Sequence, residues 1–236
     1  MSAVKTIDVM KRYELKYVLT KEQVAYIKSR LINHMEIDEY GRTSIASLYY
    51  DTPDCRLIRA SIDNPEYKEK IRLRSYGLAT NNSPLFLELK RKYDRIVYKR
   101  RVKTNQSQVD AFFSGKQIEG DKQISKEIAY FRDYYKNLVP TCLIIYDREA
   151  YFEKDGDLRL TIDFNPRYRM KDLNLSTSME GISLLNEGEA ILEIKVQEAM
   201  PLWLTHILAE GNIKKSSFSK YGTAYKLETS KMLAVA

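Results

Sequence analysis

Charged side chains recur at every second position along six segments of this 236-residue chain, and this pattern constrains the fold more than any other feature. The segments are Arg12-x-Glu14-x-Lys16, Arg72-x-Arg74, Glu88-x-Lys90-x-Lys92, Lys99-x-Arg101, Arg159-x-Thr161-x-Asp163 and Glu193-x-Lys195. Side chains two residues apart on a β-strand lie on the same face of the sheet. The six segments therefore predict strands that line one concave surface with cations and a few carboxylates. Such a surface suits a polyanion and a metal ion.

Apolar residues alternate with these charges. They are Ile71 and Leu73 around Arg72, Leu87 and Leu89 around Glu88, and Ile194 between Glu193 and Lys195. A closed barrel can point the charges inward and the apolar neighbours outward against helices. Most links between strands resemble hairpins, which favours a mainly antiparallel α+β fold. We therefore expect a closed β-tunnel of about eight strands with a basic lumen, flanked by several α-helices, as a single domain over residues 1–236.

Local signals mark individual elements of this fold. Thr20 followed by Gln23 predicts a capping box at the start of a helix. Apolar residues at helical spacing predict a helix over residues 125–138, which Pro140 ends. Residues 141–152 and 158–164 predict two strands of a hairpin.

The charge balance favours an anionic partner. Lysine and arginine number 39 against 32 acidic residues, which gives a formal net charge of +7. Cys55 and Cys142 match no metal-ligand spacing and are expected to be reduced thiols of a cytoplasmic protein. No apolar run approaches the roughly 20 residues needed to cross a bilayer. Only two histidines are present, which argues against zinc chemistry and a histidine-based triad.

An ordered series of motifs resembles a known family. The motifs are Lys16-Tyr17-Val18-Leu19, Tyr49-Tyr50-Asp51-Thr52, Lys70-x-Arg72-x-Arg74-x-Tyr76, Glu88-x-Lys90, Tyr146-x-Arg148, Arg159-x-Thr161-x-Asp163, Leu192-Glu193-x-Lys195 and Phe218-Ser219-Lys220-Tyr221. Together they resemble the polyphosphate-polymerase (VTC) domain of the vacuolar transporter chaperone family. That family belongs to the CYTH-like triphosphate tunnel metalloenzymes, which bind triphosphates inside an antiparallel β-tunnel. The resemblance extends from about residue 11 to residue 226.

The resemblance implies roles for individual residues. Those expected to act on the transferred phosphate are Arg72, Arg74, Lys90, Arg148 and Lys220. Those expected to bind substrate are Lys16, Lys99, Arg101, Tyr146, Arg159 and Ser219. Glu193 is the leading ligand for Mn²⁺ or Mg²⁺, and Glu88 and Glu14 are second candidates. Guanidinium and ammonium groups suit phosphate oxygens, and carboxylates suit these hard metal ions.

The implied activity is metal-dependent synthesis of inorganic polyphosphate from ATP, with release of ADP. Two alternatives stay open, a triphosphatase and a binding module without turnover. The expected partners are ATP, polyphosphate, inorganic triphosphate or pyrophosphate. No nucleic acid is expected, because the chain lacks a recognised RNA-binding motif.

The chain also departs from the family pattern. Many hydrolytic tunnel enzymes begin with Glu-x-Glu-x-Lys, whereas this chain has Arg12-x-Glu14-x-Lys16, which favours the polymerase branch. Ser217 stands where the family tends to have a basic residue. The family's extra regulatory domain and membrane spans are missing, so we expect a stand-alone soluble form.

Several residues have two interpretations. Alternating charges on one strand fit a solvated face with ion pairs, but six such segments together favour a lumen. Of Lys99, Arg100 and Arg101, parity predicts that the first and third face inward. Glu193 could bind metal or pair with a lumen arginine, and Asp163 could bind metal or pair with Arg159.

Overall fold

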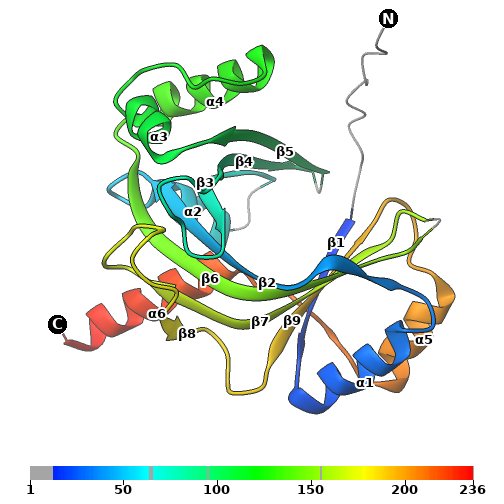
Figure 1. The fold of residues 1–236 in the computed structure, drawn as a ribbon. Helices are drawn as coiled ribbons and strands as arrows, with labels where there is room; N and C mark the ends of the chain where they lie inside the picture. The colour runs from blue at the N-terminus through cyan, green and yellow to red at the C-terminus, as the bar shows by residue number, and fades with distance from the viewer. Residues whose placement is uncertain (1–12, 64–65, 95, 155, 236) are drawn as a thin grey trace, which may run out of the picture.

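The computed structural model describes residues 13–63, 66–94, 96–154 and 156–235, and its main feature is one antiparallel sheet of ten strands (Figure 1). The strands are β1 (Tyr13–Leu19), β2 (Glu36–Asp51), β3 (Tyr67–Tyr76), β4 (Leu85–Tyr93), β5 (Ile96–Thr104), β6 (Val139–Phe152), β7 (Arg159–Arg169), β8 (Ile182–Ser183), β9 (Ala190–Val196) and β10 (Lys215–Ser216). The helices are α1 (Lys21–Leu31), α2 (Arg56–Ile62), α3 (Gln106–Phe113), α4 (Lys122–Tyr135), α5 (Leu202–Glu210) and α6 (Lys220–Val235). The predicted α+β, antiparallel class is confirmed.

The sheet is curved but open, so the prediction of a closed tunnel of about eight strands is wrong. Its strand order is β10-β1-β9-β7-β6-β2-β3-β4-β5, with β8 paired to β7, and this path does not return to its start. Side chains bridge the gap where strands do not: Lys90 of β4 lies 2.7 Å from Glu14 of β1, joining their Nζ and Oε2 atoms. Figure 1 shows β4 and β5 curving back over the middle of the sheet. We call this gap between β1 and β4 the seam.

Apolar side chains bury the outer face of the sheet, as the alternation predicts. Ile71, Leu73, Leu87, Leu89 and Ile194 are all fully buried. The first four pack in a cluster with residues of α3 and α4, whereas Ile194 packs in a second cluster with residues of α1 and α5. Figure 1 shows these two pairs of helices at opposite ends of the sheet. Each buried Leu or Ile contributes roughly 2 kcal/mol to folding, so the charges opposite them are held on the other face.

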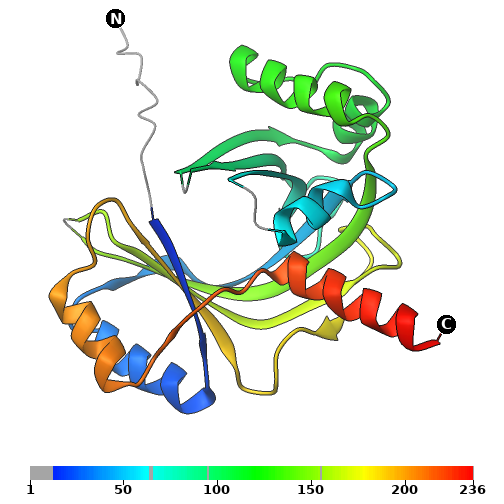
Figure 2. The same cartoon turned by 180° about the vertical axis from the view of Figure 1, so that it is seen from behind.

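A third apolar cluster holds the C-terminal helix close to the charged side chains. Tyr49 and Tyr146 of the sheet pack here with Tyr221 and Ala224 of α6. Asp51 accepts hydrogen bonds from the backbone N–H groups at the start of α2 and from the Tyr221 hydroxyl, the latter at 3.1 Å. Figure 2 shows α6 running past α2. This packing fixes the start of α6, where the Ser219-Lys220 motif lies.

Of the two predicted helices, one begins as expected and the other is shifted toward the N-terminus. The capping box is confirmed, because Thr20 and Gln23 exchange side-chain and backbone hydrogen bonds. The helix expected over residues 125–138 instead spans Lys122–Tyr135. It ends early because Lys136 and Asn137 adopt positive φ angles of 52° and 43°, which no α-helix continues. Residues from Val139 onward, Pro140 included, then join β6.

Two further expectations concern cysteines and membranes. Cys55 and Cys142 are both free thiols, as predicted. Among the described helices, none combines the length and the apolar character needed to cross a bilayer.

Candidate functional site

Most of the predicted site residues meet on the concave face of the sheet, through direct contacts with one another. The residues brought together there are Glu14, Lys16, Arg72, Arg74, Glu88, Lys90, Lys99, Arg101, Tyr146, Arg148, Asp163, Glu193, Lys195, Ser219 and Lys220. They fall into three groups, each built around carboxylates.

The first group, the Glu88 cluster, has one carboxylate surrounded by four cations. Glu88 accepts hydrogen bonds from Arg72 Nε at 2.9 Å and Arg101 Nε at 2.6 Å. Lys99 Nζ lies 2.8 Å and Arg74 Nη1 3.7 Å from the same carboxylate. Strand pairing produces this arrangement, since Arg72, Glu88 and Arg101 lie directly opposite one another on β3, β4 and β5.

The Glu88 carboxylate is buried and ion-paired. Its side chain is only 1% exposed. Burial raises the pKa of Glu88, but Arg72, Arg74 and Lys99 outweigh burial and hold the pKa below its usual range. Burial also lowers the pKa of Lys99 to about 7. Both carboxylate oxygens of Glu88 are shared among four cations, so Glu88 orients the basic residues around it, and its role as a metal ligand stays a prediction.

Two tyrosines extend the Glu88 cluster. Tyr49 accepts a hydrogen bond from Arg72 Nη1 at 2.9 Å, and Tyr146 accepts one from Arg74 Nη2 at 3.3 Å. Burial raises the pKa of Tyr146, but the cations Arg74 and Arg148 outweigh it and lower the pKa to about 8. Tyr49 also belongs to the buried apolar cluster that holds α6. Its place opposite Arg72 depends on the pairing of β2 with β3, which the sequence pattern does not specify.

The second group centres on Asp163. Arg148 binds this carboxylate through both Nε and Nη2, at 2.6 and 2.8 Å, and Lys220 Nζ donates to the same group. Lys220 also lies over the ring of Tyr146, 4.5 Å from its centroid. Burial raises the pKa of Asp163, but the positive charges of Lys220 and Arg148 outweigh burial and lower this pKa to about 2. The predicted pairing of Asp163 with Arg159 is wrong, because its partners are Arg148 and Lys220, whereas metal binding by Asp163 stays a prediction.

The third group, the Glu14–Glu193 pair, is less neutralised. Lys195 Nζ lies 2.9 Å and Lys16 Nζ 3.7 Å from Glu193. The partner of Glu14 is Lys90, across the seam. On the neighbouring strands β1 and β9, Glu14 faces Lys195 and Lys16 faces Glu193, so the two carboxylates lie on the same face. Both carboxylates retain exposed surface, 21% for Glu14 and 11% for Glu193.

The two acids of this pair influence each other. Burial raises the pKa of Glu14 and Lys90 lowers it, while the charge of Glu193 opposes its ionisation. Burial also raises the pKa of Glu193, but Lys195, Lys16 and Arg148 hold it well below its usual value. Two ionised carboxylates that repel each other fit a divalent cation. No group of three or more His, Cys, Asp or Glu side chains suited to a metal gathers among the described residues. Substrate oxygens would have to complete the coordination.

Sequence reasoning missed Lys70 as a site residue. It lies on the same strand face as Arg72 and Arg74, and its Nζ donates to the Ser219 hydroxyl at 3.3 Å. The parity of Lys70-x-Arg72-x-Arg74 was the available signal.

Arg159, predicted to bind substrate, lies away from the three groups. Arg159 is exposed; its guanidinium donates to the carbonyls of Glu153 and Leu158 and lies over the ring of Phe152, so the structure does not bring it to the three groups. Arg12 lies outside the described residues. Ser217 is exposed.

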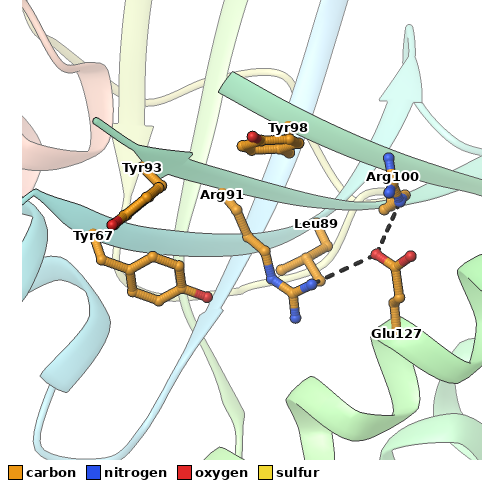
Figure 3. A pocket seen from close by; sticks show the side chains of 7 residues that line it. All are labelled: Tyr67, Leu89, Arg91, Tyr93, Tyr98, Arg100 and Glu127. Carbon is orange, nitrogen blue, oxygen red and sulfur yellow. Dashed lines mark hydrogen bonds and ion pairs between the residues drawn. The ribbon is translucent and has the colours of Figure 1, made fainter. Parts of the chain in front are cut away.

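A separate hollow of about 440 Å³ lies on the outer side of β3, β4 and β5, beside α4 (Figure 3). Its lining residues are Tyr67, Leu89, Arg91, Tyr93, Tyr98, Arg100 and Glu127. Glu127 lies between Arg91 and Arg100, at 3.5 and 2.9 Å. Arg100 thus faces outward while Lys99 and Arg101 face Glu88, as parity predicted. Its lining has two arginines and one glutamate, a smaller excess of positive charge than on the concave face.

Known proteins share this fold. A putative adenylate cyclase from Bacillus halodurans matches with a TM-score of 0.56 and 15% identity, covering 89% of this chain and 96% of that one. A putative adenylyl cyclase from Hippeastrum, described as having a dominant triphosphatase activity, matches with a TM-score of 0.54 and 15% identity, covering 90% and 93%. At these identities the likeness shows the fold alone.

Sequence comparison is more specific. The chain is 23% identical over 264 residues to vacuolar transporter chaperone complex subunit 4 of Schizosaccharomyces pombe, which covers 89% of this chain. It spans only 36% of the length of that relative. Residues 11–229 match the VTC domain family. Because this match extends over nearly the whole chain, the protein belongs to the VTC domain family.

Proposed function

We propose that the protein transfers phosphoryl groups from triphosphates with the help of a divalent metal, and that its reaction is the synthesis of inorganic polyphosphate from ATP. One observation carries the proposal: among the described residues, at least ten cations share the concave face with four carboxylates. The cations are Lys16, Lys70, Arg72, Arg74, Lys90, Lys99, Arg101, Arg148, Lys195 and Lys220. The resulting excess of positive charge matches a long, highly charged anion.

The arginines and Lys220 would hold the reacting phosphates. Arg72 and Arg74 are oriented by Glu88, and Arg148 by Asp163, so their guanidinium groups are in place before substrate arrives. Such preorganised donors stabilise charge that develops on phosphate oxygens in the transition state. Lys220 would contribute a further positive charge from the start of α6.

Glu193, assisted by Glu14, would hold the metal ion. A bound Mn²⁺ or Mg²⁺ would neutralise phosphate oxygens and help position the transferred group. Such ions commonly use one or two carboxylates together with substrate phosphates, which fits a pair of acids rather than a full protein cage.

The attacking group distinguishes two reactions. In the polymerase, an oxygen of the chain-terminal phosphate attacks the γ-phosphorus of ATP, the bond to the β–γ bridging oxygen breaks, and ADP leaves. In the triphosphatase, water attacks instead. A terminal phosphate is already an anion, whereas water needs a general base. All four carboxylates of the concave face are ion-paired, His34 stacks on Trp203 and His206 is exposed, which favours the polymerase.

Two further observations bear on this choice. Membership of the VTC domain family and the similarity to a vacuolar transporter chaperone subunit support a polyphosphate substrate. The triphosphatase described for the Hippeastrum protein, which has the same fold, supports hydrolysis as the second candidate.

The test is to incubate the purified protein with ATP and either Mn²⁺ or Mg²⁺. Products are resolved on a gel stained for polyphosphate, and ADP and free phosphate are assayed in parallel. Polyphosphate with matching amounts of ADP is the expected result. Free phosphate without chains would assign the triphosphatase. Tight triphosphate binding without turnover would assign a binding module.

A further inference from the structure

Lys70 differs from the other lysines of the concave face in its partner. Lys16, Lys90, Lys99, Lys195 and Lys220 each form an ion pair with a carboxylate. Within the described residues, no ion pair joins Lys70 to a carboxylate. The side-chain partner of its Nζ is the neutral hydroxyl of Ser219, at 3.3 Å.

The charges that act most strongly on Lys70 are all positive. Lys16 faces it from β1, Lys90 from β4, and Lys68 and Arg72 flank it on β3 itself. Ser219, from the segment before α6, adds only a hydroxyl. Burial and these four cations lower the pKa of Lys70 to about 7. A partly buried amine placed among cations is unfavourable unless an anion joins it.

Neighbouring groups point to the same position. Lys16 Nζ donates to the Phe218 carbonyl at 3.2 Å, so Lys16 and Lys70 bind adjacent residues of one segment. The Ser219 hydroxyl also accepts from the Gly222 N–H at 3.2 Å, which caps the start of α6. The positive end of the dipole of this 16-residue helix therefore adds to the charge of the two lysines.

We propose that Lys70, with Lys16 and Ser219, forms a further phosphate-binding subsite beside the seam, which takes phosphoryl oxygens of a triphosphate or polyphosphate chain. This inference rests on the proposed function and gives Lys70 a specific role in it. The subsite lies next to the Glu14–Glu193 pair, since Lys16 contacts Glu193 and Lys90 contacts Glu14. A chain held there would extend from the metal-binding carboxylates toward the start of α6.

Two consequences distinguish this role from a structural one. An anion beside Lys70 favours the protonated amine, so binding above pH 7 should take up a proton. In the folded protein without ligand, the pKa of Lys70 is about 7, below its ordinary value of 10.5. The amine is therefore protonated more readily in the unfolded chain. At neutral pH, Lys70 therefore lowers the free energy of unfolding, because folding disfavours its protonated form. Removing the amine should stabilise the free protein.

The test is calorimetric titration of inorganic triphosphate at pH 8, in two buffers that differ in ionisation enthalpy. The unmodified protein should bind with net proton uptake. Lys70→Met should bind about tenfold more weakly, as expected for the loss of one charge-assisted hydrogen bond. It should also take up less proton and show a higher Tm without ligand. Lys70→Arg should keep most of the affinity but lose the same proton uptake, because arginine stays protonated.

Lys126→Met is the matched control, since it removes an exposed lysine of α4 and should leave affinity and proton uptake unchanged. Equal affinity and proton uptake in Lys70→Met and the unmodified protein would overturn the subsite while leaving the proposed function intact. A lower Tm in Lys70→Met, with no rescue of affinity by Lys70→Arg, would assign Lys70 a structural role and overturn the subsite as well. No triphosphate binding by the unmodified protein would overturn both proposals.

Discussion

The Glu88 cluster and the Glu14–Glu193 pair are built by the same rule but reach different charge states. In both, strand pairing places carboxylates opposite cations on a neighbouring strand. Glu88 lies in the middle of three long paired strands and gathers four cations. Glu14 and Glu193 lie near the edge of the sheet, where β1 has only the two-residue strand β10 on its other side.

Burial and the number of cationic partners decide which role each of these carboxylates can have. Glu88 is 1% exposed and both of its carboxylate oxygens contact cations, so it stabilises and orients its arginines. Glu14 and Glu193 are more exposed and repel each other, and we propose that a divalent cation replaces their lysine partners. In this proposal the Glu88 cluster is fixed before substrate arrives, whereas the Glu14–Glu193 pair exchanges lysine partners for a metal ion.

The largest expected effect is on stability and tests the Glu88 cluster. Glu88→Gln leaves four cations around a neutral amide, and loss of one partner of a buried ion network costs about 3 kcal/mol or more. We expect urea denaturation at pH 7 to show this loss in the free energy of unfolding. A variant as stable as the parent would show that the cations do not depend on Glu88. Glu119→Gln, which changes an exposed acid, is the control.

The next effect is on activity and tests the other region. Glu193→Gln should reduce metal-dependent turnover at least about 100-fold, because it removes the leading ligand of the metal, while the free energy of unfolding changes little. Turnover is measured as ADP release over a range of Mn²⁺ concentrations. Glu187→Gln, in the exposed loop before β9, should behave as the parent. Unchanged turnover and unchanged metal dependence in Glu193→Gln would remove the metal assignment.

A smaller effect concerns the pH dependence of stability. The cations hold the pKa of Glu88 below its ordinary value of 4.5, so the unfolded chain takes up this proton first as pH falls. The stability that the Glu88 charge contributes is therefore complete above pH 4.5 and decreases as the pH falls below that value. The gap in unfolding free energy between the parent and Glu88→Gln should narrow accordingly from pH 5 to pH 3. A constant gap across this range would mean that the charge of Glu88 is not the source of its effect.

Much of this site could be predicted because strand parity is local. Parity separated Arg100 from Lys99 and Arg101, and it placed Glu88 and Glu193 on the concave face. The capping box at Thr20 was equally local. Each of these inferences uses residues only a few positions apart.

The rest depends on relations between distant strands. Parity does not reveal whether the edges of a sheet meet, and here Lys90 and Glu14 join across the seam where a closed barrel would have a strand pair. It also cannot count counter-ions, so neither the four cations on Glu88 nor the absence of a carboxylate partner for Lys70 among the described residues could be read from the sequence.

Arg159 shows the remaining limit and provides the smallest expected effect. It shares the strand face of Asp163, but it begins β7, and its guanidinium binds the carbonyls of Glu153 and Leu158 rather than a group of the concave face. Parity defines a face but not a position along the strand. Arg159→Met should therefore leave triphosphate affinity within about twofold, whereas Arg148→Met should lower it about tenfold or more. Calorimetric titration of both variants checks this, and a loss at Arg159 equal to that at Arg148 would show that the phosphate chain extends to the start of β7.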